Sequence, residues 1–211
     1  MFDSSINLTP SSFFSFELDC HSLTKPDFRS LTSKHVLPDL TELCNETPFA
    51  DVFLGWNQQG IAVKIVVNQP YERSTYPEFA IGDSFELFID TRDMKSAGFN
   101  TRFCHHFFFL CAADDGVQAG EITRFRTENT HPLCDPKELK VDARHSSKGC
   151  QLKIFIPSQC LTGYDPEQFD RLGFTYRINR AGGPAQHFSV VSEEYGLEQQ
   201  PSLWSSVRLK K

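Results

Sequence analysis

The segment from Gly82 to Leu110 constrains the fold more than any other part of the sequence. In its first half, GDSFELFIDTRD, the apolar residues Phe85, Leu87 and Ile89 alternate with a second set that is mostly polar. A period of two over this length predicts a β-strand with two different faces. The second half, RFCHHFFFL, is apolar on both faces, as is typical of a central strand covered above and below. This segment is therefore predicted to form the middle of a β-sheet.

Short segments of the same kind recur along the rest of the chain. The clearest hairpin joins Asp51–Trp56 to Gly60–Val67, and Gly60 can supply a positive φ in the turn. Further strands are expected at Phe13–Cys20, Glu121–Thr127, Leu139–Ala143, Cys150–Ile156, Leu172–Asn179, Gln186–Val191 and Ser206–Leu209. About ten strands, turn signals every ~8–12 residues and almost no helical period predict an all-β protein. The expected fold is an antiparallel β-sandwich or jelly roll with few short helices.

The length of 211 residues fits one large domain of this class. Residues 1–211 are expected to form a single β-sandwich, because strands are expected near both ends and no low-complexity linker separates them. Residues 1–45 are expected to supply an opening strand and loops that pack on this domain. The 20 phenylalanines favour a well-packed β protein, since Phe is common in strands and buries much apolar area.

Charge and cysteine usage exclude several classes of partner. The net charge is −6 and the basic residues are scattered, which argues against a nucleic-acid ligand. No apolar stretch is long enough to cross a bilayer, and Met1–Ser15 lacks the basic start and apolar run of a secretory signal. The seven cysteines are odd in number and show no CxxC spacing, so reduced thiols in a cytoplasmic protein are expected.

Metal binding and catalysis have little support in the sequence. Cys104 and His106 fall on one strand face, but zinc would need two more ligands. Ca²⁺ binding at the acidic turns Asp90–Asp93 and Asp114–Asp115 stays an open alternative. Neither turn has the oxygen-rich spacing of a defined calcium loop. No Ser-His-Asp order, G-x-S-x-G motif, phosphate loop or H-E-x-x-H motif is present. The sequence thus predicts no catalytic residues and no cofactor.

Candidate binding residues follow from which side chains share a strand face. Glu86, Phe88 and Asp90 share one, and a carboxylate beside a ring suits a sugar, because the ring stacks on C–H groups while the acid bonds hydroxyls. A half-solvated sheet face explains the same pattern. The full candidate set adds Arg92, Arg102, His105, Arg177, Asn179 and Gln186. Structural pairing of the arginines, and a hydrogen-bonded core role for His105, remain open.

Five motifs give the sequence a family resemblance. They are Asp90-Thr-Arg-Asp93, Arg102-Phe-Cys-His105, Leu161-Thr-Gly-Tyr-Asp-Pro166, Leu172-Gly-Phe-Thr-Tyr176 and Pro201-Ser-Leu-Trp204. Together with GDSFELFIDTRD they resemble family 9 carbohydrate-binding modules and their DOMON-like relatives, and most closely an uncharacterised branch of them. The resemblance covers roughly residues 51–209.

The resemblance implies a β-sandwich and, by analogy, sugar binding. Members of the family hold a terminal sugar between two Trp rings, while acidic, Arg and Asn side chains bond its hydroxyls. Glu86 falls where the family has its sugar-binding acid. The two positions where the family has its Trp residues are occupied here by Ala80, beside Phe79, and by the turn Arg180-Ala-Gly-Gly183.

Three functions follow as hypotheses. The first is a non-catalytic module that binds a carbohydrate or similar polyol at the candidate residues. The second is an interaction or scaffold protein whose contact surface is the ring-rich loop Tyr71–Phe79. The third is a glycoside-acting hydrolase, which would require Glu86 and Asp90 to line one cleft.

Overall fold

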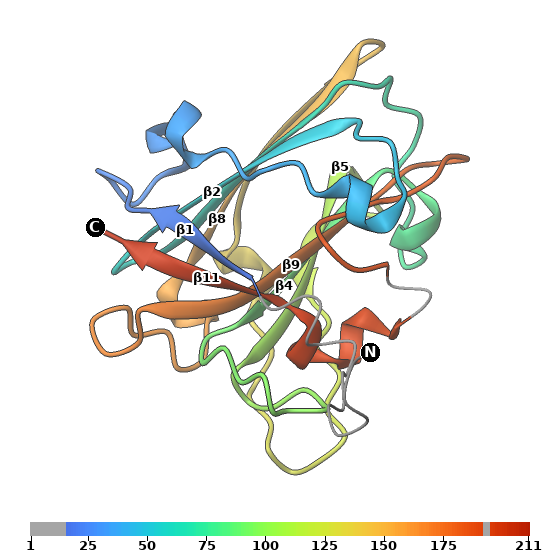
Figure 1. The fold of residues 1–211 in the computed structure, drawn as a ribbon. Coiled ribbons are helices and arrows are strands. Elements are labelled where there is room, and N and C mark those ends of the chain that lie inside the picture. The colour runs from blue at the N-terminus through green and yellow to red at the C-terminus, as the bar shows by residue number, and fades with distance from the viewer. Residues whose placement is uncertain (1–15, 192–194) are drawn as a thin grey trace, which may run out of the picture.

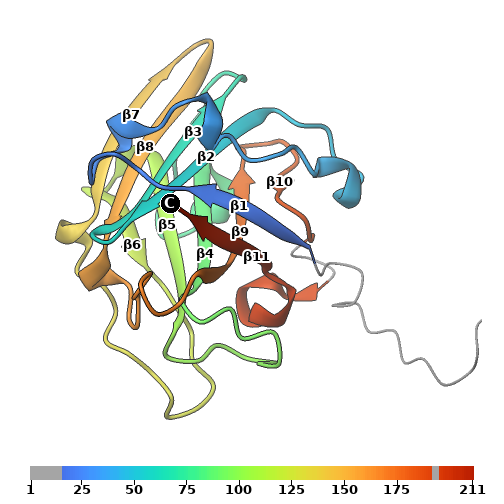
Figure 2. The same ribbon diagram turned by 60° about the vertical axis from the view of Figure 1, so that its left-hand side comes forward.

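A computed structural model describes residues 16–191 and 195–211, and in these residues the chain forms eleven strands in two sheets (Figure 1). Sheet A has the order β1 (Glu17–His21), β11 (Ser205–Lys210), β9 (Arg171–Asn179), β4 (Ser84–Asp90), β5 (Cys104–Asp114) and β6 (Val117–Glu121), and β10 (Gln186–His187) also pairs with β9. Sheet B has the order β2 (Ala50–Asn57), β3 (Gly60–Val67), β8 (Gly149–Pro157) and β7 (Lys140–Ser146). The two sheets form the layers of a β-sandwich (Figure 2).

The predicted central strand is β4, which pairs with β5 on one side and with β9 on the other. Phe85, Leu87 and Ile89 point into the core between the sheets and are fully buried. The opposite face of β4 is buried as well, so it is not the half-solvated face that alternation alone allows. It is covered by segments that follow other strands, including the one ending in Trp204, which packs on Phe88.

The hairpin between β2 and β3 forms as predicted. Gly60 has a φ of +147°, and a Cβ atom there would lie 2.1 Å from the carbonyl oxygen of Ile156. Glycine is therefore required at this turn both by its backbone conformation and by the close approach of β8.

The 3₁₀ elements of the described residues are short turns around the sheets. The 3₁₀ turns of three or four residues are η1 (Phe28–Ser30), η2 (Ser33–His35), η3 (Thr41–Cys44), η4 (Phe79–Ile81), η5 (Pro136–Glu138), η6 (Ser158–Cys160), η7 (Leu197–Gln199) and η8 (Pro201–Leu203). Among the described residues, no helix has the length and apolar character that a membrane crossing needs.

The structure differs from the sequence-based expectation at three strands. The strand expected at Glu121–Thr127 is wrong: β6 lies before it, at Val117–Glu121, and only Glu121 is shared. Beyond Glu121, side chains replace strand pairing, since Thr123 Oγ1 accepts from the His106 amide and Asn100 donates to the Arg124 carbonyl. β10 is only two residues long. β1 pairs with β11 in parallel, and the expected beginning of that strand at Phe13 lies outside the described residues.

Candidate functional site

A hollow of about 280 Å³ opens on the outer face of sheet A, away from the core between the sheets. Strands β4, β5 and β9 form its floor, and η4, residues 122–124 and η7 form its walls. The residues that line it are Phe79, Ala80, Glu86, His106, Ile122, Arg124, Arg177, Glu198 and Gln199. Two of them are glutamates and two are arginines, so charged groups from distant parts of the chain converge here.

Glu86 is the centre of the floor, and both of its carboxylate oxygens are hydrogen-bonded. Arg177 donates through Nε to Oε1 and through Nη2 to Oε2, each at 2.8 Å. Asn179 Nδ2 donates to Oε1 at 2.7 Å, and His106 Nε2 lies 2.8 Å from Oε2. Register explains the convergence, since Glu86 lies directly opposite Arg177 on β9 and its neighbour Phe88 lies opposite His106 on β5.

The network fixes the charge of Glu86. Burial alone would raise the pKa of its carboxyl group. The hydrogen bonds from His106 and Arg177, together with the charge of Arg177, outweigh burial and lower this pKa to about 2. Burial lowers the pKa of Arg177, while Glu86 and Glu198 more than restore it. The floor is therefore an ionised pair at neutral pH. Its carboxylate is fully buried, and Arg177 and His106 are the parts of the network that reach the hollow, with exposed side-chain fractions of 13% and 8%.

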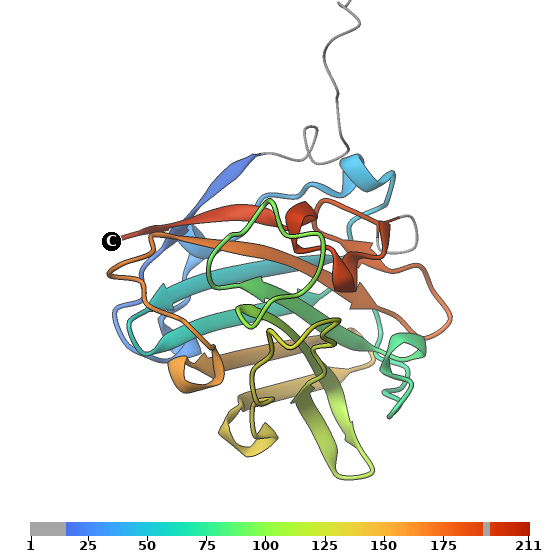
Figure 3. The ribbon, with the colours of Figure 1, turned by 90° about the horizontal axis from the view of Figure 1, so that it is seen from below.

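The side-chain amide of Asn100 connects two walls of the hollow, residues 122–124 and η7. Asn100 Nδ2 donates to the carbonyl oxygens of Arg124, at 3.0 Å, and Glu198, at 2.9 Å. Glu198 also binds Arg177 Nη1 at 2.7 Å, so this wall is tied to the floor as well. In Figure 3 the loop that carries Asn100, drawn in green, lies beside the red segment of η7 and η8.

The remaining wall is aromatic. Phe79 stacks on Phe108 of β5 with ring centroids 4.9 Å apart, and Tyr76 stacks on the same ring at 5.7 Å. Phe79 is partly exposed and lines the hollow next to Ala80. The hollow thus combines charged groups on its floor with a ring on one side.

The structure brings three of the nine predicted site residues together, Glu86, Arg177 and Asn179. Phe88 shares their face but is fully buried between His106, at a ring distance of 4.2 Å, and Trp204. Trp204 is itself 1% exposed and belongs to the same buried cluster as Phe88.

Asp90 and Arg92 lie outside the hollow. The Asp90 carboxylate closes the turn after β4 by accepting from the amides of Arg92, at 2.9 Å, and Met94, at 2.7 Å. Burial raises the pKa of Asp90, and these two amides oppose the rise. The guanidinium of Arg92 lies over the Phe169 ring and donates to the Gly163 carbonyl. Glu86 and Asp90 therefore do not line one cleft, as a glycosidase would require.

Arg102, His105 and Gln186 are also elsewhere. Arg102 donates to Asn129 at the surface. His105 follows the alternation of β5 onto the inner face, 2.9 Å from Glu121. Gln186 was a candidate binding residue, but it lies opposite Ile178 and accepts from the amide of Phe49 at 2.8 Å, so it connects the two sheets.

Several lining residues were not predicted from the sequence. His106 was considered only as a metal ligand beside Cys104, and Arg124, Glu198 and Gln199 were not candidates. The alternation of β5 places His106 on the face of Glu86, and this signal was available. No sequence signal places Glu198 or Arg124, because they belong to irregular segments held by Asn100.

Other hollows have fewer converging charges. The groove of about 510 Å³ along β6 is lined mainly by small and apolar residues of an edge strand, together with Glu121 and Lys137. Glu121 turns inward to His105. Polar groups that converge on one point are what orient a small ligand, and this feature favours the hollow over Glu86.

Comparison with known proteins identifies structural relatives. No protein-family model matches the chain, and no curated protein sequence matches it. A family 9 carbohydrate-binding module from Caldicellulosiruptor kristjanssonii, solved in complex with cellotriose, superposes with a TM-score of 0.63 at 14% identity, over 92% of this chain and 94% of the module. The same kind of module in complex with glucose gives 0.64 at 14% identity, over 92% and 96%.

A provisionally assigned carbohydrate-binding protein from Bacteroides uniformis gives a TM-score of 0.59 at 9% identity, over 92% of this chain and 99% of that protein. These likenesses span nearly the whole of each chain. They confirm the β-sandwich and show that its fold is like that of family 9 carbohydrate-binding modules.

Proposed function

We propose that this protein binds a carbohydrate in the hollow over Glu86 and that it does so without catalysis. The observation that carries the proposal is the polar floor formed by Glu86, Arg177 and His106, which lies beside the ring of Phe79. Sugars present both C–H faces and hydroxyl groups, and a hollow with a ring and charged hydrogen-bonding groups can bind both.

The charges of the hollow suit a neutral ligand. Glu86 and Glu198 balance Arg177 and Arg124, so the lining has both hydrogen-bond donors and acceptors with no excess of formal charge from these four groups. Its volume of about 280 Å³ lies at the lower end of the roughly 300–1,000 Å³ range of ligand pockets, which favours one sugar ring over an extended chain. The fold adds support, since solved proteins of this fold hold glucose and cellotriose.

The proposal assigns Glu86 a positioning role. Its carboxylate orients Arg177 and His106, and these two side chains, together with Glu198, are the ones expected to meet the sugar hydroxyls. Ala80 lies in the wall at the place where the family resemblance implies a tryptophan. A weaker hold on the sugar than in family members with both rings is therefore expected.

Calorimetry with glucose, xylose and cellotriose tests the proposal. Binding of at least one sugar is expected. Glu198→Gln should weaken binding about tenfold, because one hydrogen bond to a charged group is worth about 1.5–3 kcal/mol. The matched control is Glu17→Gln, which removes another partly exposed glutamate of an arginine pair from β1, outside the hollow. The proposal is wrong if no sugar gives heat, or if both variants bind alike.

Restoring a ring to the wall is a second prediction. Ala80 is exposed at the edge of the hollow, so Ala80→Trp can add an aromatic face without entering the core. Stacking of this kind is worth about 0.5–1.5 kcal/mol, which corresponds to a two- to tenfold gain in sugar affinity. Calorimetry measures the gain, and Ala80→Leu controls for added apolar area alone. An equal gain from both variants would contradict the stacking explanation.

The scaffold hypothesis has less support. Two rings of the loop Tyr71–Phe79 pack on Phe108, and Tyr71 lies 4.4 Å from the ring of His145. Rings packed in this way leave less of the loop as a contact surface.

A further inference from the structure

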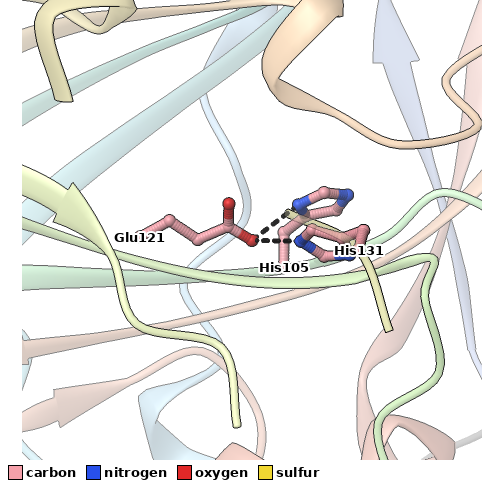
Figure 4. A group of neighbouring side chains, drawn as sticks. All are labelled: His105, Glu121 and His131. Carbon is pink, nitrogen blue, oxygen red and sulfur yellow. Dashed lines mark hydrogen bonds and ion pairs between the residues drawn. The ribbon is translucent and has the colours of Figure 1, made fainter. Parts of the chain in front are cut away.

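A second cluster of titratable side chains lies on the inner face of sheet A, apart from the hollow. His105 Nδ1 is 2.9 Å from Glu121 Oε1, and His131 Nε2 is 2.8 Å from the same oxygen (Figure 4). All three ligand atoms lie within 4.8 Å of one another. The side chains of His105 and Glu121 are fully buried, and that of His131 is 2% exposed.

The partners of His131 constrain its protons. Its Nδ1 lies 2.7 Å from the carbonyl oxygen of Arg102, which can only accept a hydrogen bond. A neutral His131 must therefore carry its proton on Nδ1, which leaves the lone pair of Nε2 facing the Glu121 carboxylate. A lone pair and a carboxylate oxygen at 2.8 Å require a cation between them, either a proton or a metal ion. A ring nitrogen that donates to a backbone carbonyl is also how metal-bound histidines are commonly oriented.

His105 fits the same arrangement. Its Nε2 is buried and makes no hydrogen bond to the described residues. With the proton on Nε2, the lone pair of Nδ1 also points at Glu121 Oε1.

Glu121 is held in place by groups that are not titratable. Thr123 Oγ1 donates to Oε1 at 2.7 Å, and the Cys134 amide donates to Oε2 at 2.7 Å. These two donors fix the orientation of the Glu121 carboxylate. Oε1 therefore lies between the two imidazoles, 2.9 Å from His105 Nδ1 and 2.8 Å from His131 Nε2.

We propose that His105, Glu121 and His131 bind one zinc ion through Nδ1, Oε1 and Nε2. Two imidazoles and one carboxylate are a ligand set that zinc uses with one further position open to water. Tetrahedral zinc at ligand distances of 2.0–2.1 Å places its ligands about 3.3 Å apart. The two contacts of 2.8 and 2.9 Å need to open by only about half an ångström to admit the ion.

Zinc bound at this site would affect the hollow through the segment that connects Glu121 to His131. His131 and Glu121 bracket the segment 122–130, which contributes Ile122 and Arg124 to the hollow. A zinc ion shared with His105 of β5 would hold both ends of this segment and so fix the position of that wall. The zinc proposal does not depend on the nature of the ligand in the hollow.

Zinc titration of chelator-treated protein tests the proposal. One zinc ion per chain is expected by calorimetry and elemental analysis, with a rise in Tm. His131→Gln and Glu121→Gln should each weaken binding at least about tenfold. His145→Gln, which changes an exposed histidine on β7, is the matched control and should bind as the wild type does. No zinc uptake by the wild type, or equal uptake by all variants, would overturn the proposal and leave a proton-linked ion pair.

The seven cysteines are alternative ligands for zinc, so a second test identifies the ligand atoms in the wild-type protein. X-ray absorption of the zinc-loaded wild-type protein should show only nitrogen and oxygen ligands at about 2.0–2.2 Å. Cobalt substitution should likewise give no thiolate-to-metal charge-transfer band. A sulfur shell at about 2.3 Å would place the ion on cysteines and contradict the assignment.

Discussion

Replacing Glu86 with alanine is expected to lower the free energy of unfolding by about 3–5 kcal/mol. The substitution removes the acceptor for two hydrogen bonds from Arg177 and one from Asn179. Arg177 keeps its charge but has only 13% of its side chain exposed, so water replaces little of what it loses. Breaking one side of a buried ion pair costs more than the pair contributes, because the other charge stays buried.

Urea unfolding followed by fluorescence measures this loss. Glu198→Gln is the control: it removes the other carboxylate of Arg177, which is 33% exposed, and should cost less than about 1 kcal/mol. Replacing the pair together, Glu86→Leu with Arg177→Met, should cost less than Glu86→Ala alone, since no buried charge is left. If the single and paired variants are equally unstable, the loss reflects packing and not charge.

Acid is expected to remove about 3 kcal/mol of stability through the titration of Glu86 alone. Its pKa is about 2 in the folded protein, against an ordinary value of 4.5. The unfolded chain therefore binds this proton at a higher pH than the folded protein does. The stabilisation is complete above the ordinary pKa and declines as the pH falls from about 4.5 toward about 2.

The comparison of wild type with Glu86→Gln isolates this effect from other acidic groups. The difference in unfolding free energy between the two proteins should be constant near neutral pH and shrink by about 3 kcal/mol between pH 5 and pH 2. Urea titrations at several pH values give the curve. A difference that does not change with pH would mean that the pKa of Glu86 is the same in the folded and unfolded protein, which would contradict the prediction.

Local periodicity predicted the central part of the fold and of the site. The alternation in Ser84–Asp90 placed Glu86 on the face opposite Phe85, Leu87 and Ile89, and the same rule in Leu172–Asn179 put Arg177 and Asn179 outward. Because β4 and β9 are neighbours in register, these predictions meet at one point.

The rest depends on contacts that no local pattern records. Arg124 and Glu198 enter the hollow from segments held by a side chain, Asn100, and not by a sheet. Gln186 faces inward because β10 is a two-residue strand whose pairing with Ile178 fixes its side, and the sequence alone does not specify that pairing. His131 comes from a loop, so its meeting with Glu121 could not be anticipated from spacing.

The double hydrogen bond of Asn100 means that one amide group helps to set the spacing of the two walls above Glu86, together with the bonds of Glu198 to Arg177 and of Gln199 to Arg126. Substitution of Asn100 in related proteins would therefore change the width of the hollow, and with it the size of ligand that fits, while the hydrogen bonds between Glu86 and Arg177 stay in place.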